Sequence, residues 1–224
     1  VDSIRGIVAR TYNANVLSEL GSFGGLYRFP KDSYREPVLV SSTDGVGTKL
    51  RVAIKARRFD TIGQDLVNHC VNDILVQGAL PLFFLDYIGL GKMEPDMIVQ
   101  IISGMAKACS ENGCALIGGE MAEMPGIYQG GDFDLVGTIV GVVDKEHLLP
   151  AARIKKGDIL IGIPSSGLHT NGYSLARRIV FDRLGLDVAD RVPELDATVA
   201  ELLLGVHRSY LPMLKPLLRD ERLH

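Results

Sequence analysis

The sequence predicts an α+β or α/β fold, with one sheet covered by helices on one face and a second, incomplete α/β domain after it. Within the first 150 residues, strand-like and helix-like segments follow in the order strand, helix, strand, helix, strand, strand. Such alternation packs helices on a sheet, but it is not regular enough for a doubly wound fold. Near residue 150 the chain becomes polar, with Pro150 and Gly157, so we divide it into domains 1–150 and 151–224.

The first domain is expected to contain four strands and two long helices. Apolar runs of strand length predict strands over 36–43, 81–88, 114–119 and 133–144. A helix over 60–79 is predicted because Asp60 can cap its start and Gly78 can end it. A second helix over about 95–112 begins at a proline and ends at Gly113.

The second domain shows one strand and two helices. The strand is expected over 159–166, one helix after the glycine-rich turn 165–172, and another over about 196–218. A lone strand leaves both of its edges unpaired. We therefore expect this domain to be incomplete, with the chain stopping at His224 before it is finished.

Composition and charge indicate which classes of protein and partner the sequence fits. With 46% hydrophobic and 23% charged residues, the 224-residue chain resembles soluble globular proteins. The net charge of −3 gives no electrostatic reason to expect nucleic acid or a membrane surface as partner. The three cysteines are odd in number and lie in apolar segments, which predicts buried reduced thiols and a cytoplasmic protein.

Carboxylates are concentrated where basic residues are missing. No lysine or arginine lies between Arg58 and Lys92, or between Lys107 and Lys145, although ten acidic residues do. Carboxylates brought together without a basic partner repel, and a hard cation such as Mg²⁺ neutralises them. The alternative is that these acids are ordinary solvated groups whose partners come from elsewhere in the fold.

The predicted helix 60–79 has a polar face without lysine. At about 100° per residue, that face carries Asp65, Asn68, His69, Asn72 and Asp73. It fits either a ligand-binding face or a polar contact between domains or subunits. His69 alone is interpreted as a hydrogen-bonded histidine and not as a metal ligand.

Three loops could carry chemistry. In the turn 42–49, Gly45 and Gly47 let the backbone approach a phosphate, Lys49 could contact it, and Asp44 could hold a metal. The turn lacks the spacing of a Walker A loop. Glu120 ends a buried strand, and the loop 165–172 could bind an anion, with His169 orienting substrate. Each could equally be ordinary turn chemistry.

Four segments together resemble one enzyme family. They are DGVGTK (44–49), VNDILVQGALPLFFLDY (71–87), GGEMAEMPG (118–126) and SSGLHTNGYSL (165–175). Their order and spacing are similar to those of phosphoribosylformylglycinamidine cyclo-ligase, also called aminoimidazole ribonucleotide synthetase. In this family Met121 is commonly threonine, and the chain continues beyond the point where this sequence ends.

The resemblance implies a cytoplasmic ligase of purine biosynthesis that uses ATP and Mg²⁺. It would phosphorylate the formyl-amide oxygen of formylglycinamidine ribonucleotide, and the amidine nitrogen would then close the imidazole ring. The first domains of two subunits would form a β-barrel across a homodimer.

The resemblance also implies residue roles. Metal ligands would be Asp44, Asp65, Asp73 and Glu120. The nucleotide would contact Gly45, Gly47, Thr48, Lys49, Asn72 and Glu120. Substrate would face Ser166, His169 and Asn171, and the catalytic groups would be Asp44, Lys49, Asp73 and His169.

Three other readings stay open. The chain could be another ATP–Mg²⁺ enzyme of the same superfamily, such as formylglycinamidine ribonucleotide synthetase, selenophosphate synthetase or thiamine-phosphate kinase. It could be a non-catalytic, truncated nucleotide-binding or dimerisation module. It could also be a plain structural α/β domain, if the acidic faces are coincidental.

Overall fold

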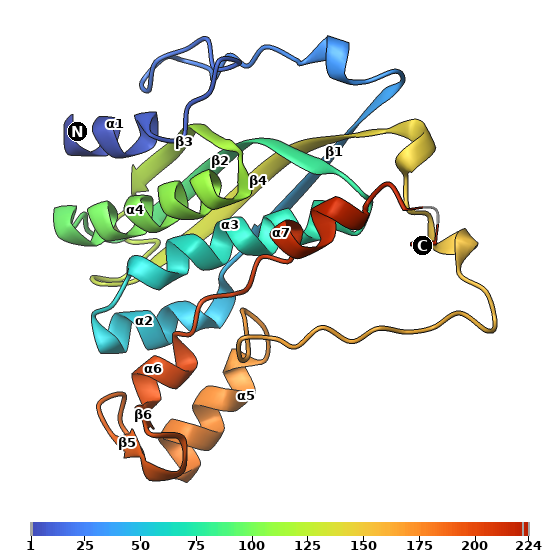
Figure 1. The fold of residues 1–224 in the computed structure, drawn as a ribbon. Helices are drawn as coiled ribbons and strands as arrows, with labels where there is room; N and C mark the ends of the chain where they lie inside the picture. The colour runs from blue at the N-terminus through green and yellow to red at the C-terminus, as the bar shows by residue number, and fades with distance from the viewer. Residues whose placement is uncertain (1, 221, 224) are drawn as a thin grey trace.

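A four-stranded mixed sheet forms the centre of the molecule (Figure 1). The structure, a computed structural model, describes residues 2–220 and 222–223. The strands lie in the order β1-β4-β2-β3. Their bounds are β1 Pro37–Gly45, β2 Leu80–Leu90, β3 Ala115–Glu123 and β4 Phe133–Asp144.

Strand β4 organises the sheet because it pairs antiparallel with both β1 and β2. β3 joins the other side of β2 in parallel, as expected for two strands connected through a helix. This order places β1 and β3 at opposite edges. Asp44 of β1 pairs with Gly137, whereas Glu120 of β3 pairs with Tyr87.

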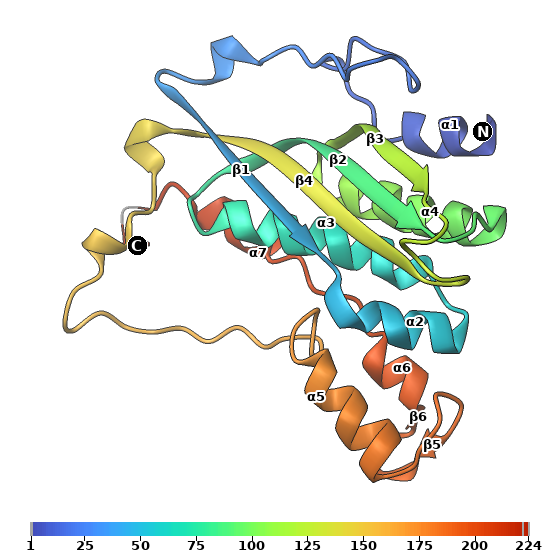
Figure 2. The ribbon, with the colours of Figure 1, turned by 180° about the vertical axis from the view of Figure 1, so that it is seen from behind.

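Two long helices, α3 (Asp60–Leu75) and α4 (Pro95–Asn112), cover one face of the sheet, as predicted. Seen from behind, the opposite face carries no helix (Figure 2). Among the described residues the sheet is open and does not close into a barrel. The core between helices and sheet is made of fully buried side chains that include Ile62, Leu66, Cys70, Ile74, Phe84 and Ile139.

The two long helices approach each other closely at glycines. A Cβ atom added to Gly63 of α3 would lie 2.1 Å from the carbonyl oxygen of Ile101 in α4. A Cβ atom on Gly104 of α4 would lie 2.5 Å from the carbonyl oxygen of Asp60. Backbone atoms cannot move aside as side-chain ends can, so both positions require glycine.

The strands and long helices within residues 1–150 were predicted correctly, with small shifts at their ends. The predicted helix 60–79 stops at Leu75, and a turn leads through Gly78, whose φ is +82°. Two short helices were missed, α1 (Asp2–Ala9) and α2 (Leu50–Ala56). α2 has no side-chain cap that could have marked its start. The three cysteines are free and buried, as expected.

The strand predicted over 159–166 does not form. This segment runs extended with no strand pairing among the described residues, and Ile159, Leu160 and Ile161 are 84–93% exposed. The apolar pattern was read correctly, but a strand needs a neighbour to accept its backbone hydrogen bonds. The loop that follows leads into α5 (Tyr173–Arg177) and a π-helical turn over Arg178–Arg183.

The single helix predicted over 196–218 is also wrong. The structure has two short helices, α6 (Val199–Leu203) and α7 (Leu211–Leu214), preceded by a small hairpin of β5 (Arg191–Val192) and β6 (Ala197–Thr198). Residues 205–210 lie between α6 and α7, and their backbone groups form hydrogen bonds with side chains of α3. Those tertiary hydrogen bonds replace the ones a continuous helix would have made.

None of the described helices has both the length and the apolar character that crossing a membrane requires.

We predict that Gly63→Ala destabilises the protein by about 1–3 kcal/mol or more, because the added methyl group overpacks the α3–α4 contact. Gly6→Ala is the matched control, since Gly6 also lies in a helix but a Cβ atom there meets nothing within 4 Å. The control should be neutral or slightly stabilising. Urea denaturation measures both, and equal stabilities for the two variants would contradict the close approach.

Candidate functional site

The polar face of α3 holds a later segment of the chain. The Asp65 carboxylate accepts the backbone N–H of His207 at 2.7 Å, and the Asn68 amide donates to the carbonyl of His207 at 2.8 Å. The Asn72 amide donates to the carbonyl of Arg208 and accepts the N–H of Tyr210. Residues 65, 68 and 72 thus form a stripe that fixes segment 205–210, which we call the docked segment.

Lys49 and Asp65 form a completely buried ion pair beneath the docked segment. Lys49 Nζ lies 2.7 Å from Asp65 Oδ2, and both side chains are 0% exposed. The ammonium also donates to the carbonyls of Gly205 at 2.7 Å and His169 at 3.2 Å. Through this ion pair and these two hydrogen bonds, Lys49 joins α3 to two separate later parts of the chain.

Burial opposes both charges of this pair. It raises the pKa of Asp65 to about 6, although Lys49 and the N–H of His207 act in the opposite direction. It lowers the pKa of Lys49, while Asp65 partly restores it. The pair is stable only because each charge has the other within contact distance.

This arrangement corrects two sequence expectations. Lys49 was expected to reach a phosphate, but its ammonium is buried and bound to Asp65 and two backbone carbonyls inside the protein. Asp65 was expected to lack a basic partner, and Lys49 supplies one. The gap in basic residues along the sequence hid this, because Lys49 lies outside it and the fold brings it to α3. Asp60 and Asp132 likewise meet Arg58 and Arg51.

Two of the other predicted carboxylates, Asp44 and Asp73, meet around His69. His69 Nε2 lies 3.0 Å from Asp44 Oδ2 and 3.9 Å from Asp73 Oδ1. One ligand atom from each of the three residues falls within 4.8 Å of the others. Within the described part of the chain, the ion pairs of these two carboxylates involve only this histidine and no lysine or arginine.

Local geometry brings together Asp44, Asp73 and His69, which we call the carboxylate cluster. His69 and Asp73 are four residues apart and share one side of α3. Asp44 is the last residue but one of β1, the edge strand that packs beside α3. Ser42 lies two residues before Asp44, on the same face of β1, and its hydroxyl donates to Asp73 Oδ2 at 2.8 Å. Asp44 is 45% exposed and Asp73 35%, so the carboxylate cluster is open to solvent.

Two further histidines lie behind the carboxylate cluster. The Thr170 hydroxyl contacts His69 Nδ1 at 3.0 Å and His207 Nδ1 at 3.3 Å. The His207 ring stacks between the rings of His69, at 5.2 Å, and His169, at 4.1 Å. Burial, followed by the neighbouring positive charges, lowers the pKa of His207 to about 3.

The predicted substrate loop touches the docked segment. Ser166 donates its hydroxyl to the carbonyl of Val206 at 2.6 Å and its N–H to His169 Nε2 at 3.1 Å. His169 has a φ of +57°, a left-handed conformation that its carbonyl bond to Lys49 helps to hold. Asn171 is exposed on the same loop. The structure thus brings this loop to the rear of the carboxylate cluster.

The remaining predicted residues divide between this site and elsewhere. Gly45 follows Asp44 as the last residue of β1. Gly47, with a φ of +69°, and Thr48 lie in the short 3-10 turn between β1 and α2. Glu120 is not brought to the carboxylate cluster. It lies exposed on β3, three strand spacings or about 14 Å across the sheet from β1.

A cavity of about 850 Å³ adjoins the carboxylate cluster. His69, Asn72, Asp73 and His207 line its polar end, and Val76, Ile161, Ile163 and Leu214 are among its apolar walls. A volume in this range with a few polar groups at one end is typical of small-molecule sites. Within the docked segment, Tyr210 also reaches this cavity.

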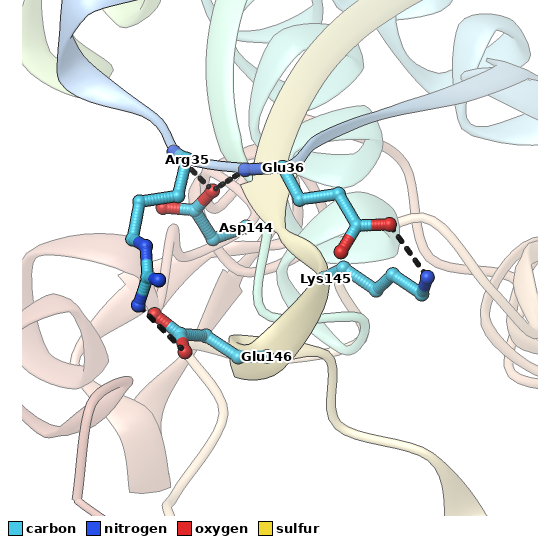
Figure 3. Close-up of a pocket in the computed structure, with 5 residues that line it drawn as sticks. All are labelled: Arg35, Glu36, Asp144, Lys145 and Glu146. Atoms are coloured by element: carbon cyan, nitrogen blue, oxygen red, sulfur yellow. Dashed lines mark hydrogen bonds and ion pairs between the residues drawn. The ribbon is translucent and has the colours of Figure 1, made fainter.

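A smaller cavity at the far ends of β1 and β4 has a structural explanation (Figure 3). Asp144 Oδ1 accepts the backbone N–H groups of Arg35 and Glu36. The surrounding charges pair with each other, Lys145 with Glu36 and Arg35 with Glu146. These contacts fasten the entry to β1.

Sequence reasoning missed Ser42, Thr170 and His207. Ser42 could have been found from the alternation of β1, which puts residues 42 and 44 on one face. Thr170 and His207 carry no local signal, because only the tertiary fold brings them to α3.

We predict that Lys49→Met destabilises the protein by about 3–5 kcal/mol, because it leaves the Asp65 carboxylate buried without its cation. The double variant Lys49→Met/Asp65→Asn should recover part of this loss, since it removes the orphaned charge as well. Denaturant unfolding measures the free energies. A single variant as stable as the wild type would contradict the buried pair.

The depressed pKa of His207 predicts a pH dependence. The unfolded chain takes up a proton on His207 near the ordinary pKa of about 6.5, whereas the folded protein resists it until about pH 3. Stability from this group is therefore complete above 6.5 and declines as the pH falls. Between pH 7 and 5 the wild type should lose about 1–2 kcal/mol more than His207→Gln. Parallel curves for the two proteins would contradict this.

Comparisons with known proteins agree with this fold. A family described as AIR synthase related protein, N-terminal domain, matches residues 25–143. A phosphoribosylformylglycinamidine cyclo-ligase of Trichlorobacter lovleyi is 53% identical over 224 residues, which is 100% of this chain and 64% of the relative. One of Geobacter metallireducens is 51% identical with the same coverage. The chain thus spans less than two thirds of these relatives.

Among solved structures, the thiamine-monophosphate kinase of Stenotrophomonas maltophilia has a TM-score of 0.61 at 22% identity, covering 89% of this chain and 58% of its own. The hydrogenase maturation protein HypE, in complex with ATP, has a TM-score of 0.50 at 20% identity, covering 67% and 42%. At these identities the likeness is one of fold. The family match extends over more than half of the sequence, and the chain therefore belongs to the AIR synthase related family.

Proposed function

We propose that this chain is the front part of a phosphoribosylformylglycinamidine cyclo-ligase. The enzyme converts formylglycinamidine ribonucleotide to aminoimidazole ribonucleotide in purine biosynthesis, with ATP phosphorylating the formyl-amide oxygen before ring closure. The observation that carries the proposal is the carboxylate cluster of Asp44 and Asp73, which is open to solvent and lies beside a cavity of small-molecule size. Among the described residues, no lysine or arginine forms an ion pair with either carboxylate. The cyclo-ligases at 51–53% identity support the same activity.

The donor set of the carboxylate cluster fits Mg²⁺. Asp73 Oδ1 lies 3.9 Å from its nearest ion-pair partner, and each carboxylate oxygen of Asp44 has a further lone pair beyond its protein contact. Mg²⁺ is commonly held by one or two carboxylates together with waters and nucleotide phosphates. In the proposed site Asp44 and Asp73 hold the ion, which supplies charge neutralisation for the phosphates.

The chain's own residues then have distinct roles. Gly45, Gly47 and Thr48, which follow Asp44, lie next to the phosphates, where the glycines permit close approach of the backbone. His169, Ser166 and Asn171 present the loop 166–171 to the substrate. Three residues have a supporting role in the proposed site. Lys49, Asp65 and Asn72 hold the docked segment and this loop against α3. ATP use is supported by the fold shared with HypE, whose structure contains ATP.

The domain division and assembly belong to the same proposal. Residues 1–150 form an ATP- and Mg²⁺-binding, dimerising domain, and residues 151–224 begin a second domain. The helix-free face of the sheet, seen in Figure 2, is the surface through which two cytoplasmic subunits would complete a β-barrel. Glu120 lies on β3, at the opposite edge of the sheet from Asp44. It could contact a nucleotide or a metal ion only at a place separate from the carboxylate cluster.

We predict that Asp73→Asn weakens Mg²⁺–ATP binding by at least about tenfold, because the amide loses the charge that attracts the cation. The fold should stay intact, since the neutral amide can still accept the hydrogen bond from Ser42. Asp32→Asn is the control, because Asp32 is an exposed carboxylate before the start of β1, whereas Asp44 lies near the end of that strand. Calorimetry measures the affinity, and circular dichroism checks the fold.

An unchanged affinity in Asp73→Asn would contradict the metal site. The activity itself is tested by incubating the full-length protein with ATP, Mg²⁺ and formylglycinamidine ribonucleotide. The proposal expects ADP and aminoimidazole ribonucleotide together. ATP turnover that requires a different phosphoryl acceptor would instead favour another enzyme of the superfamily.

A further inference from the structure

The hydrogen bonds behind the carboxylate cluster determine where His69 carries its proton. Two backbone partners fix the orientation of the Asn72 amide. Asn72 Oδ1 accepts the N–H of Tyr210 at 3.0 Å, and Nδ2 donates to the carbonyl of Arg208 at 2.8 Å. A flipped amide would lose both bonds. Nδ2 is therefore also the donor in its 3.0 Å contact with His207 Nε2.

His207 must then hold its proton on the other nitrogen. Its Nε2 is an acceptor from Asn72, so the neutral ring carries hydrogen on Nδ1. The side chain is only 6% exposed, and burial keeps it neutral by lowering its pKa to about 3. Nδ1 lies 3.3 Å from the Thr170 hydroxyl oxygen and donates to it.

The hydrogen bonds of Thr170 decide whether His69 Nδ1 donates or accepts. Its oxygen accepts from His207, and its own hydrogen has His69 Nδ1 within reach at 3.0 Å. His69 Nδ1 is consequently an acceptor. The neutral His69 ring carries its hydrogen on Nε2, which faces Asp44 Oδ2 at 3.0 Å.

We propose that His69 is a positioning residue, which donates Nε2–H to Asp44 and is held in that tautomer by a relay through Thr170, His207 and Asn72. Because Nε2 carries a proton, His69 is not a metal ligand, and the site offers the cation oxygen atoms alone. The role in metal binding rests on the proposed function, whereas the tautomer does not.

The relay also links the two parts of the chain. Asn72, His69 and Asp44 belong to the first domain, while Thr170 and His207 come from the second. The tautomer of His69 that donates to Asp44 therefore depends on the docked segment lying on α3. Cation binding at Asp44 and docking of residues 205–210 therefore favour each other.

The first test is the tautomer, measured on the metal-free protein by long-range ¹H–¹⁵N NMR at about pH 8, above the ordinary histidine pKa of about 6.5. We expect His69 to be protonated on Nε2 and His207 on Nδ1. Thr170→Val removes the relay hydroxyl while keeping the shape, so His69 should lose its single tautomer. A wild-type His69 protonated on Nδ1 would overturn the proposal.

The second test is Mg²⁺–ATP affinity by calorimetry. His69→Leu should lose about 10- to 100-fold in affinity, the usual effect of removing a group that orients a metal ligand. His69→Gln should stay within a few-fold of the wild type, because its amide nitrogen can donate to Asp44 in place of Nε2. His147→Gln, which changes a histidine outside the relay in the turn after β4, is the control.

The two tests separate this inference from the proposed function. Equal affinity in His69→Leu and the wild type would overturn the positioning role while leaving the metal site in place. A wild-type protein that shows the expected tautomers but binds no Mg²⁺–ATP would overturn the proposed function and, with it, the part of His69 in metal binding.

Discussion

The buried ion pair between Lys49 and Asp65 is the interaction on which the site depends. Two charges without solvent are costly unless each is fully paired, and here the lysine also bonds the carbonyls of His169 and Gly205. Those bonds bring the loop 166–171 and the docked segment onto α3. The histidines, Thr170 and the cavity walls then take their places around Asp44 and Asp73.

Helix α3 serves two purposes with one polar face. Asp65, Asn68 and Asn72 bind the backbone of residues 205–210, and this use of their polar groups is structural. His69 and Asp73 lie on the adjoining side and face Asp44. Of the two interpretations of this face from sequence, the contact with another part of the chain is made by Asp65, Asn68 and Asn72. The ligand-binding surface stays a prediction, which now rests on Asp73 beside Asp44.

Much of the first domain could be predicted from sequence because its signals are local. The alternation in β4 and the proline and glycine at the ends of α4 act within a few residues. Residues 151–224 were harder to predict. Residues 159–166 have a strand pattern without a partner strand, and residues 205–210 form hydrogen bonds with α3 in place of a helix. In the site, the adjacency of Asp44 and Asp73 agreed with the prediction, whereas the partner of Asp65 could be found only from the tertiary fold.

The central claim is that Asp44 and Asp73 form a cation site while Asp65 and Glu120 stand apart from it. Anomalous diffraction from crystals soaked with Mn²⁺, an ion that also prefers oxygen ligands, tests this most directly. We expect a manganese peak between the carboxylates of Asp44 and Asp73, with the Lys49–Asp65 pair undisturbed. A peak at Asp65, with Lys49 displaced, would contradict it.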